Sequence, residues 1–185
     1  MISVTGFVSE KTSYHHGEAS LTGTIVGIAQ DFIGSNNINL LDPIGQFGSR
    51  VGGGKDSAQP RYIHTKLMDI TKKIFNPNDS MLLDYNDDDG LLVEPVYYVP
   101  IIPMILVNGC SGIGTGWSTD IPCFKPETII KNIRSILNDG AYIEMYPWYR
   151  KFTGTIEKVN DYSFRTKGIY SFKDDDTLVI DELPV

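Results

Sequence analysis

A long glycine-rich segment between two helical patterns is the feature that most limits how this chain can fold. Residues 39–59 contain five glycines, at positions 45, 48, 52, 53 and 54. Glycine weakens helices and strands and permits tight turns. The segment therefore predicts a long loop or hairpin rather than a regular element.

Apolar residues recur at helical spacing on both sides of this segment. Before it, a helix is predicted to begin near Gly17-Glu18 and to end before Gly34, with an apolar face formed by Leu21, Ile25, Ile28 and Phe32. After it, a second helix is predicted with Pro60 in its first turn and Asn76-Pro77 as its stop, its apolar face formed by Ile63, Leu67, Ile70 and Ile74. Two helices around a glycine-rich hairpin suggest a helix-turn-helix with an attached wing, which presents one helix to a DNA groove.

The second half of the chain mixes short strands with one clear helix. Residues 104–107 predict a buried strand, and residues 126–137 predict a helix that starts with proline and stops before Gly140. From Phe152 onward, turn residues separate short runs that predict an antiparallel meander: 154–159, 162–166, 169–172 and 177–180. The fold class is therefore α+β.

The charge distribution bears on what the chain can bind. Its formal net charge is −7, whereas DNA-binding proteins usually carry a basic surplus. Residues 1–83 hold seven basic and seven acidic residues, and residues 84–185 hold nine basic and sixteen acidic ones. Much of the excess lies in two tracts, 84–89 and 174–176, that we interpret as solvated turns. A local basic site in the first half is compatible with this distribution.

Apolar residues make up 41% of the sequence and charged residues 21%, as in ordinary globular proteins. No membrane helix is predicted, because the most apolar stretch, 91–107, contains a glutamate and three prolines. Residues 1–9 do not resemble a secretion signal. Cys110 and Cys123 are predicted to be reduced thiols in an intracellular protein.

Three cations lie within twelve residues before and at the start of the second predicted helix: Arg50, Lys55 and Arg61. Glycines let a backbone approach phosphate closely, and a helix start offers free N–H groups. Tyr62 follows Arg61, off the predicted apolar face. A phenol attacks phosphorus only with help from a base or cation, and Arg61 could neutralise the developing charge. From this dipeptide alone, a surface tyrosine beside a surface arginine remains the simpler interpretation.

Three further patterns suggest a nucleotide, dinucleotide or metal site, but each lacks residues or spacing that such a site needs. Residues 52–56 lack the leading glycine and the Ser/Thr of a nucleotide-binding loop, and residues 112–116 are too tightly spaced for a dinucleotide fingerprint. His15 and His16 are adjacent and so point to different faces, with no third ligand evident nearby, so surface or phosphate-contacting histidines are the better interpretation. No metal site is predicted.

A series of motifs runs through the whole chain in order, ending with Asp181-Glu182-Leu183-Pro184. The others are Tyr14-His15-His16-Gly17-Glu18, Gly34-Ser35-Asn36-Asn37, Gly45 to Arg50, Gly53 to Ser57, Pro60-Arg61-Tyr62-Ile63, Glu94-Pro95, Pro100 to Met104, Asn108-Gly109 and Gly112 to Trp117. This series resembles the eukaryotic DNA topoisomerase II family in the residues of each motif, in the order of the motifs and in their spacing. One departure is Cys110-Ser111, where relatives often carry Ala-Glu.

The resemblance implies roles for individual residues. Tyr62 matches the tyrosine that attacks DNA to form a 5′-phosphotyrosyl link, and Arg61 matches the arginine that stabilises the transition state. Ile113 matches an isoleucine that wedges between base pairs and bends the DNA. Further DNA contacts are implied for Tyr14, His15 and His16 along the cleaved strand and for Arg50 and Lys55 on the backbone.

The resemblance also implies an architecture: a winged-helix domain over residues 1–95, incomplete at its start, and the beginning of a tower domain over residues 96–185. Mg²⁺ and ATP would serve the full-length enzyme and bind outside this fragment, which would be inactive alone. The implied partners are double-stranded DNA and a second copy of the chain, in the nucleus or in a large virus. Two alternatives stay open, the A subunit of a gyrase-like bacterial enzyme and a non-catalytic winged-helix DNA-binding module.

Overall fold

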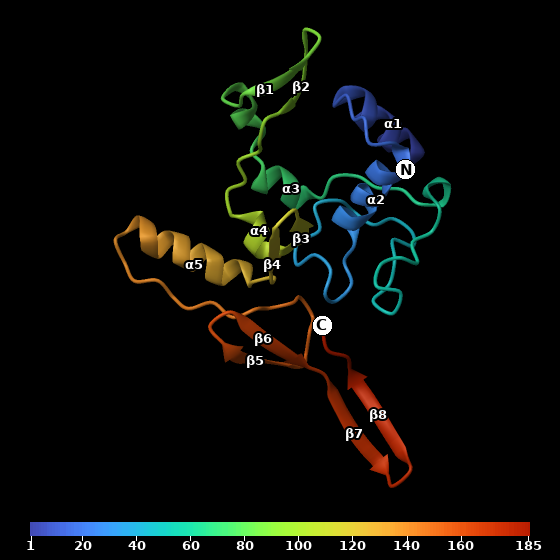
Figure 1. Cartoon of the computed structure of the whole chain (residues 1–185), viewed down its shortest axis with the longest axis vertical. Coiled ribbons are helices and arrows are strands. Elements are labelled where there is room, and N and C mark those ends of the chain that lie inside the picture. Colours follow the sequence, from blue (N-terminus) through green and yellow to red (C-terminus); the bar gives the residue numbers. More distant parts are fainter. The chain divides into compact units, whose positions relative to one another are not determined.

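The computed structural model describes all 185 residues (Figure 1). The chain divides into two compact units. Unit 1 comprises residues 1–32 and 38–102, and unit 2 comprises residues 33–37 and 103–185. Helices and antiparallel sheets are both present, which confirms the α+β class. None of the helices combines the length and apolarity needed to span a membrane.

One helix supplies most of the core of unit 1, and a second helix packs against it. The first is α2 (Glu18–Ala29), which confirms the predicted helix at its start, and the second is α1 (Ile2–Lys11), which adds the partly buried Val4 and Val8. The buried face of α2 differs in part from the predicted one. Ile28, which was predicted to be on it, is 37% exposed, whereas Val26 and Ala29 are buried. The core cluster consists of Met1, Leu21, Ile25, Val26, Ala29, Phe47 and Ile63.

The second predicted helix is wrong over most of its length. A single 3₁₀ turn, η1 (Pro60–Tyr62), is followed by extended backbone and then by the short helix α3 (Asp69–Ile74). The extended part pairs with the glycine-rich segment: His64 and Ile44 exchange both backbone hydrogen bonds, at 2.9 and 3.1 Å. This tertiary pairing competes successfully with the local helical preference. Residues 39–59 form no regular strand, as predicted for a long loop.

The remainder of unit 1 holds the 3₁₀ turn η2 (Pro77–Met81) and a hairpin of β1 (Tyr85–Asp88) and β2 (Leu91–Pro95). The acidic tract 84–89 was expected to be a turn, and most of it is instead strand β1. Only Asp89 and Gly90 form the turn, with φ of 51° and 84°. Positive φ at both central residues matches the twist of a two-residue hairpin, which makes the connection possible.

The first helix of unit 2 is α4 (Met104–Val107), where a buried strand was predicted. Val107 is fully buried as expected, but Pro103 starts one helical turn instead of a strand. A hairpin of β3 (Cys110–Gly114) and β4 (Trp117–Ile121) follows. Next comes α5 (Pro126–Leu137), which confirms the predicted helix at both ends.

The last four strands are β5 (Thr155–Asn160), β6 (Ser163–Lys167), β7 (Ile169–Asp174) and β8 (Thr177–Glu182). The four predicted strands are confirmed, but β5–β6 and β7–β8 are two separate antiparallel sheets, so the continuous meander is wrong. Only Gly168 separates β6 from β7, which leaves no room for a turn between them. The β-hairpins therefore follow one another without pairing.

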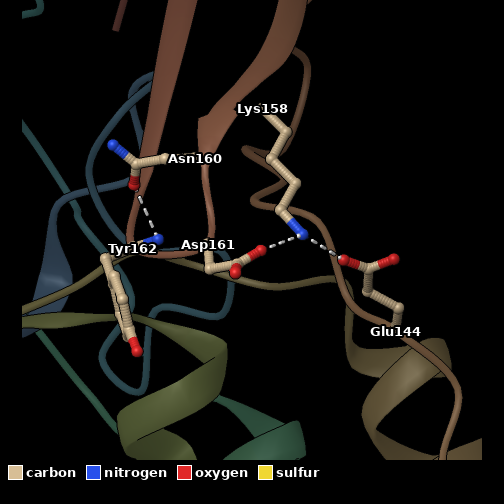
Figure 2. Close-up of polar contacts among 5 residues, drawn as sticks. All are labelled: Glu144, Lys158, Asn160, Asp161 and Tyr162. Carbon is tan, nitrogen blue, oxygen red and sulfur yellow. Dashed lines mark hydrogen bonds and ion pairs between the residues drawn. The ribbon is translucent and has the colours of Figure 1, made fainter.

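A small ionic cluster ties the β5–β6 hairpin to the segment after α5. Figure 2 shows Lys158 between two carboxylates, with its Nζ 2.8 Å from Glu144 Oε1 and 3.0 Å from Asp161 Oδ1. Both hydrogen bonds raise the pKa of Lys158, and the one to Glu144 has the larger effect. In the same turn the Asn160 side chain accepts a hydrogen bond from the Tyr162 amide.

Candidate active site

Tyr62 is exposed because its neighbour is buried. Gln59 accepts a 2.9 Å hydrogen bond from the Tyr62 amide, which closes the η1 turn that Pro60 begins. Ile63 is fully buried in the core of unit 1, whereas Tyr62 is 66% exposed. The buried side chain anchors the turn, so the phenol projects into solvent. The prediction that Tyr62 lies off the core is confirmed, although its turn is 3₁₀ and not the start of a long helix.

Arg61 lies against the phenol ring. Its Cζ atom is 4.9 Å from the centre of the Tyr62 ring, within the range of a cation–π contact. The side chains of both residues are exposed. A guanidinium in this place can stabilise negative charge that develops near the tyrosine oxygen, and it can donate to phosphate oxygens.

The glycine-rich loop is held in one conformation by bonds within residues 49–56. The Asp56 carboxylate accepts hydrogen bonds from the Ser49 amide at 2.8 Å and the Ser49 hydroxyl at 2.6 Å. These bonds, the hydroxyl first, lower the pKa of Asp56. Arg50 and Lys55 both lie on this closed loop, Arg50 half-buried and Lys55 exposed.

Gln30, just after α2, fastens the same loop to the helix. Its Nε2 donates to the carbonyl of Phe47 at 2.9 Å and to that of Gly54 at 2.8 Å. Gly54 has a φ of 76°, and a Cβ there would lie 2.6 Å from Gln30 Nε2. Only glycine permits this close approach. Nothing in the sequence pattern distinguishes Gln30 from a surface residue, and it was not among the predicted site residues.

A groove of about 530 Å³ runs between α2 and the loop. The α2 residues that line the groove include three small ones, Ala19, Gly23 and Gly27. Lys55 and Pro60 border its other side, so a predicted DNA contact and the first residue of the Tyr62 turn line one depression.

The connection between α1 and α2 carries the three remaining predicted residues of unit 1. The Tyr14 hydroxyl donates to Ser20 Oγ at 3.0 Å, and the rings of Tyr14 and His16 meet edge to face at 5.4 Å. His15 and His16 are exposed. Tyr14 is thus oriented by α2, the helix that forms one wall of the groove.

Ile113 belongs to unit 2, in strand β3 and opposite Ser118. The side chain is 94% exposed. Trp117 on the same hairpin is 84% exposed and was not predicted as a site residue.

The chain's residues do not fit Mg²⁺ or a nucleotide. No group of three or more His, Cys, Asp or Glu side chains is placed to hold a metal ion. In the loop that resembles a nucleotide-binding motif, the Asp56 carboxylate is bonded to Ser49 and lies so close to Gly52 that a Cβ there would clash with it. These residues therefore carry no site for Mg²⁺ or a nucleotide.

A family model of the DNA gyrase/topoisomerase IV A subunit matches residues 2–185. The chain is 55% identical over 178 residues to DNA topoisomerase 2 of Saccharomyces cerevisiae, covering 96% of this chain and 12% of that protein. It is 54% identical over 183 residues to DNA topoisomerase 2 of Acanthamoeba polyphaga mimivirus, covering 98% and 14%. For DNA topoisomerase 2 of Arabidopsis thaliana the identity is 52% over 186 residues, covering 98% and 13%.

A solved structure has the same fold. The chain superposes with a TM-score of 0.96 on the crystal structure of the Plasmodium falciparum topoisomerase II DNA-binding, cleavage and re-ligation domain. Sequence identity is 50%, and the match covers 99% of this chain and 25% of that one. The chain therefore spans about an eighth of the length of the curated relatives it matches.

Proposed function

We propose that this chain, which belongs to the DNA gyrase/topoisomerase IV A-subunit family of type II DNA topoisomerases, is the DNA breakage-and-reunion segment of a eukaryotic-type enzyme. The parent enzyme passes one duplex through a transient double-strand break in another. Tyr62 is its nucleophile. The observation that carries the proposal is the exposed Tyr62 phenol under the Arg61 guanidinium.

In the proposed reaction the Tyr62 oxygen attacks a backbone phosphorus. A bond from phosphorus to the tyrosine oxygen forms as the bond to the 3′ oxygen breaks, and the phenol's proton passes to solvent while the released 3′ oxygen takes one up. The product is a 5′-phosphotyrosyl link and a free 3′ hydroxyl. Arg61 stabilises the charge on the pentavalent phosphorus. Resealing is the reverse attack and needs no external energy source, because the phosphodiester energy is kept in the link.

The other predicted residues hold and shape the DNA. Lys55 on the groove and Arg50 on the same loop contact backbone phosphates, which supply most of the affinity of such interfaces. Tyr14, His15 and His16 line the cleaved strand. Ile113 inserts between base pairs as a wedge, and its exposed β-branched side chain suits that role.

Unit 1 corresponds to the proposed winged-helix domain and unit 2 to the start of the tower. The proposed boundary at residues 95/96 lies close to residue 102, where the second part of unit 1 ends. ATP and Mg²⁺ serve the parent enzyme from outside these residues. The enzyme works as a homodimer in the nucleus, and the mimivirus relative makes a viral origin an alternative.

Two rival functions differ in what they require of Tyr62. A bacterial gyrase-like A subunit would use the same chemistry, but the relatives described above are all named DNA topoisomerase 2, which favours the eukaryotic type. A non-catalytic winged-helix module would bind DNA without needing a phenol at position 62. Covalent trapping of DNA separates this second rival from the proposal.

The test uses the full-length protein with Tyr62→Phe, which removes only the nucleophilic oxygen. We expect DNA binding to remain and detergent-trapped protein–DNA adducts to disappear. Tyr170→Phe is the matched control, because Tyr170 is 67% exposed and Tyr62 66%. Arg61→Lys should still form adducts but on the order of 10- to 100-fold more slowly, since a lysine keeps the charge but loses the planar fork. An adduct that persists in Tyr62→Phe would contradict the proposal.

A further inference from the structure

The Asn37 side chain is buried in unit 2 and joins four segments of it. It is 4% exposed. Its Nδ2 donates to the carbonyls of Val107 at 3.0 Å, Phe124 at 3.3 Å and Trp148 at 2.9 Å. Its Oδ1 accepts a 2.8 Å hydrogen bond from the Arg150 amide. The amide orientation is determined by these partners, because the reverse orientation would set an oxygen against three carbonyl oxygens.

Two of these carbonyls mark the base of the β3–β4 hairpin. Val107 ends α4, three residues before β3 begins at Cys110, and Phe124 follows β4, which ends at Ile121. The same two segments are joined directly by the Phe124 amide, which donates to the Leu106 carbonyl at 2.8 Å. Asn37 therefore holds both ends of the hairpin's base through one amide group.

The hairpin has little else to fix its direction. Every residue of β3 is exposed, and so is every residue of β4 except Ile121, which is only half-buried. Gly109, between α4 and β3, has a φ of 72°, and a Cβ there would lie 2.6 Å from the Ile121 carbonyl oxygen. The base is thus closely packed while the strands are not. With about 3.3 Å per residue, Ile113 lies roughly 13 Å beyond Gly109, so a small tilt at the base displaces Ile113 by ångströms.

We propose that Asn37 is a positioning residue that sets the direction of the β3–β4 hairpin and thereby the placement of Ile113 against DNA. The role rests on the proposed function, since it assigns Asn37 to the DNA-bending step. Asn37 follows Gly34 and Ser35 in the segment 33–37, which leaves unit 1 after Phe32 and returns to it at Ile38. The segment 33–37, which follows α2 in the chain, therefore also sets the position of Ile113.

The isosteric change Asn37→Asp tests this in the full-length protein. The carboxylate still accepts from the Arg150 amide, but it places oxygen against three carbonyls where an N–H₂ group had donated. Asn132→Asp is the matched control, since Asn132 is also 4% exposed in unit 2 and its amide bonds Ile143 at 2.7 and 2.8 Å, away from the hairpin. Asn37→Ala serves if the aspartate variant does not fold.

Three properties are measured in variants whose folded fractions, by circular dichroism, are equal. Energy transfer between dyes at the ends of a duplex gives the DNA bend, hydrogen exchange of the DNA-free protein gives protection of amides 110–121, and detergent trapping gives the rate of DNA cleavage. We expect Asn37→Asp to lose the bend, to expose these amides and to slow DNA cleavage by on the order of 10- to 100-fold, the usual effect of an ångström-scale misplacement. Asn132→Asp should change none of these.

Ile113→Ala separates the two proposals. If Ile113→Ala loses the bend while Asn37→Asp keeps both the bend and the protection of the hairpin, the role of Asn37 is wrong and the wedge stands. If Ile113→Ala bends DNA normally, the wedge is wrong. In that case unchanged protection in Asn37→Asp would overturn the positioning role as well, and lost protection would support it.

Discussion

Tyr62 and Ile63 are adjacent in the chain but lie in opposite environments, one 66% exposed and the other fully buried. A 3₁₀ turn that ends at Tyr62 and extended backbone at Ile63 make this possible, because the two side chains then point apart. The sequence alone predicted an exposed Tyr62 from the helical period of Ile63, Leu67, Ile70 and Ile74. That prediction was correct for Tyr62, but Leu67 is 53% exposed, because residues 63–67 pair with the glycine-rich segment.

The two cysteines should differ sharply in reactivity. Cys110 is exposed on β3, whereas burial of Cys123 raises the pKa of its thiol to about 11. At pH 8 only about one in a thousand Cys123 side chains is then a thiolate, the reactive form. A chromogenic disulfide reagent should therefore titrate one thiol rapidly in the native protein and the second only after unfolding.

The variant Cys110→Ser should abolish the rapid phase and Cys123→Ser should leave it intact. Rapid reaction of both thiols in the native protein would show that Cys123 is not held in the buried, protonated state.

At the scale of elements, the sequence predicted those that depend on local signals. The helix α5 was predicted at both ends because a proline starts it and its apolar residues keep one period. The four strands after Phe152 were predicted from their turn residues. The η1 and α3 region was missed because it is interrupted by pairing with residues 41–44, and no local pattern carries that information. The helix α4 was missed because an apolar run suggested a strand where Pro103 starts one helical turn.

The candidate site divides in the same way. Charge and spacing singled out Tyr62, Arg61, Arg50 and Lys55 as candidates, although a surface tyrosine beside a surface arginine remained the simpler interpretation. The roles proposed for them, like those of Tyr14, His15, His16 and Ile113, came from the family resemblance. Gln30 and Asn37 were missed because their roles consist of bonds to backbone carbonyls far along the chain, 70 residues or more for all three of those of Asn37. An amide residue after a helix gives no such signal in sequence.

Helix α2 contains two interior glycines that the fold does not require. A Cβ on Gly23 or Gly27 would meet no atom within 4 Å, and neither residue has a positive φ. Gly23→Ala and Gly27→Ala should each stabilise the protein by about 0.5–1 kcal/mol, because alanine restricts the unfolded chain and favours the helix. Thermal or denaturant unfolding measures the change.

Gly54→Ala is the matched control and should destabilise, since its φ is 76° and its Cβ would approach Gln30 to 2.6 Å. If Gly23→Ala proves as destabilising as Gly54→Ala, then α2 does not have the open face described here.

At the scale of the whole molecule, the net charge of −7 limits what these residues can do alone. The basic residues of the proposed DNA site lie in the first half, where acidic and basic residues balance. No metal-binding group of side chains is present. The isolated 185-residue chain should therefore bind duplex DNA weakly, and less as salt rises, because phosphate contacts release counterions.

The same chain should cleave no DNA when Mg²⁺ is added. Fluorescence anisotropy at several salt concentrations and a supercoiled-plasmid cleavage assay measure the two properties. Lys55→Ala should reduce the salt slope by about one. Magnesium-dependent cleavage by the isolated chain would contradict the assignment of the metal site to other parts of the enzyme.

The central claim is that Tyr62, among the ten tyrosines of the chain, forms the covalent link to DNA. Its most direct test is to trap the full-length protein on DNA with detergent, digest the protein and the DNA, and locate the residual nucleotide by mass spectrometry. We predict a single modified peptide that carries a nucleotide on Tyr62, joined through its 5′ phosphate and leaving a free 3′ hydroxyl on the other DNA end. A nucleotide on any other residue, or a link through a 3′ phosphate, would contradict the account.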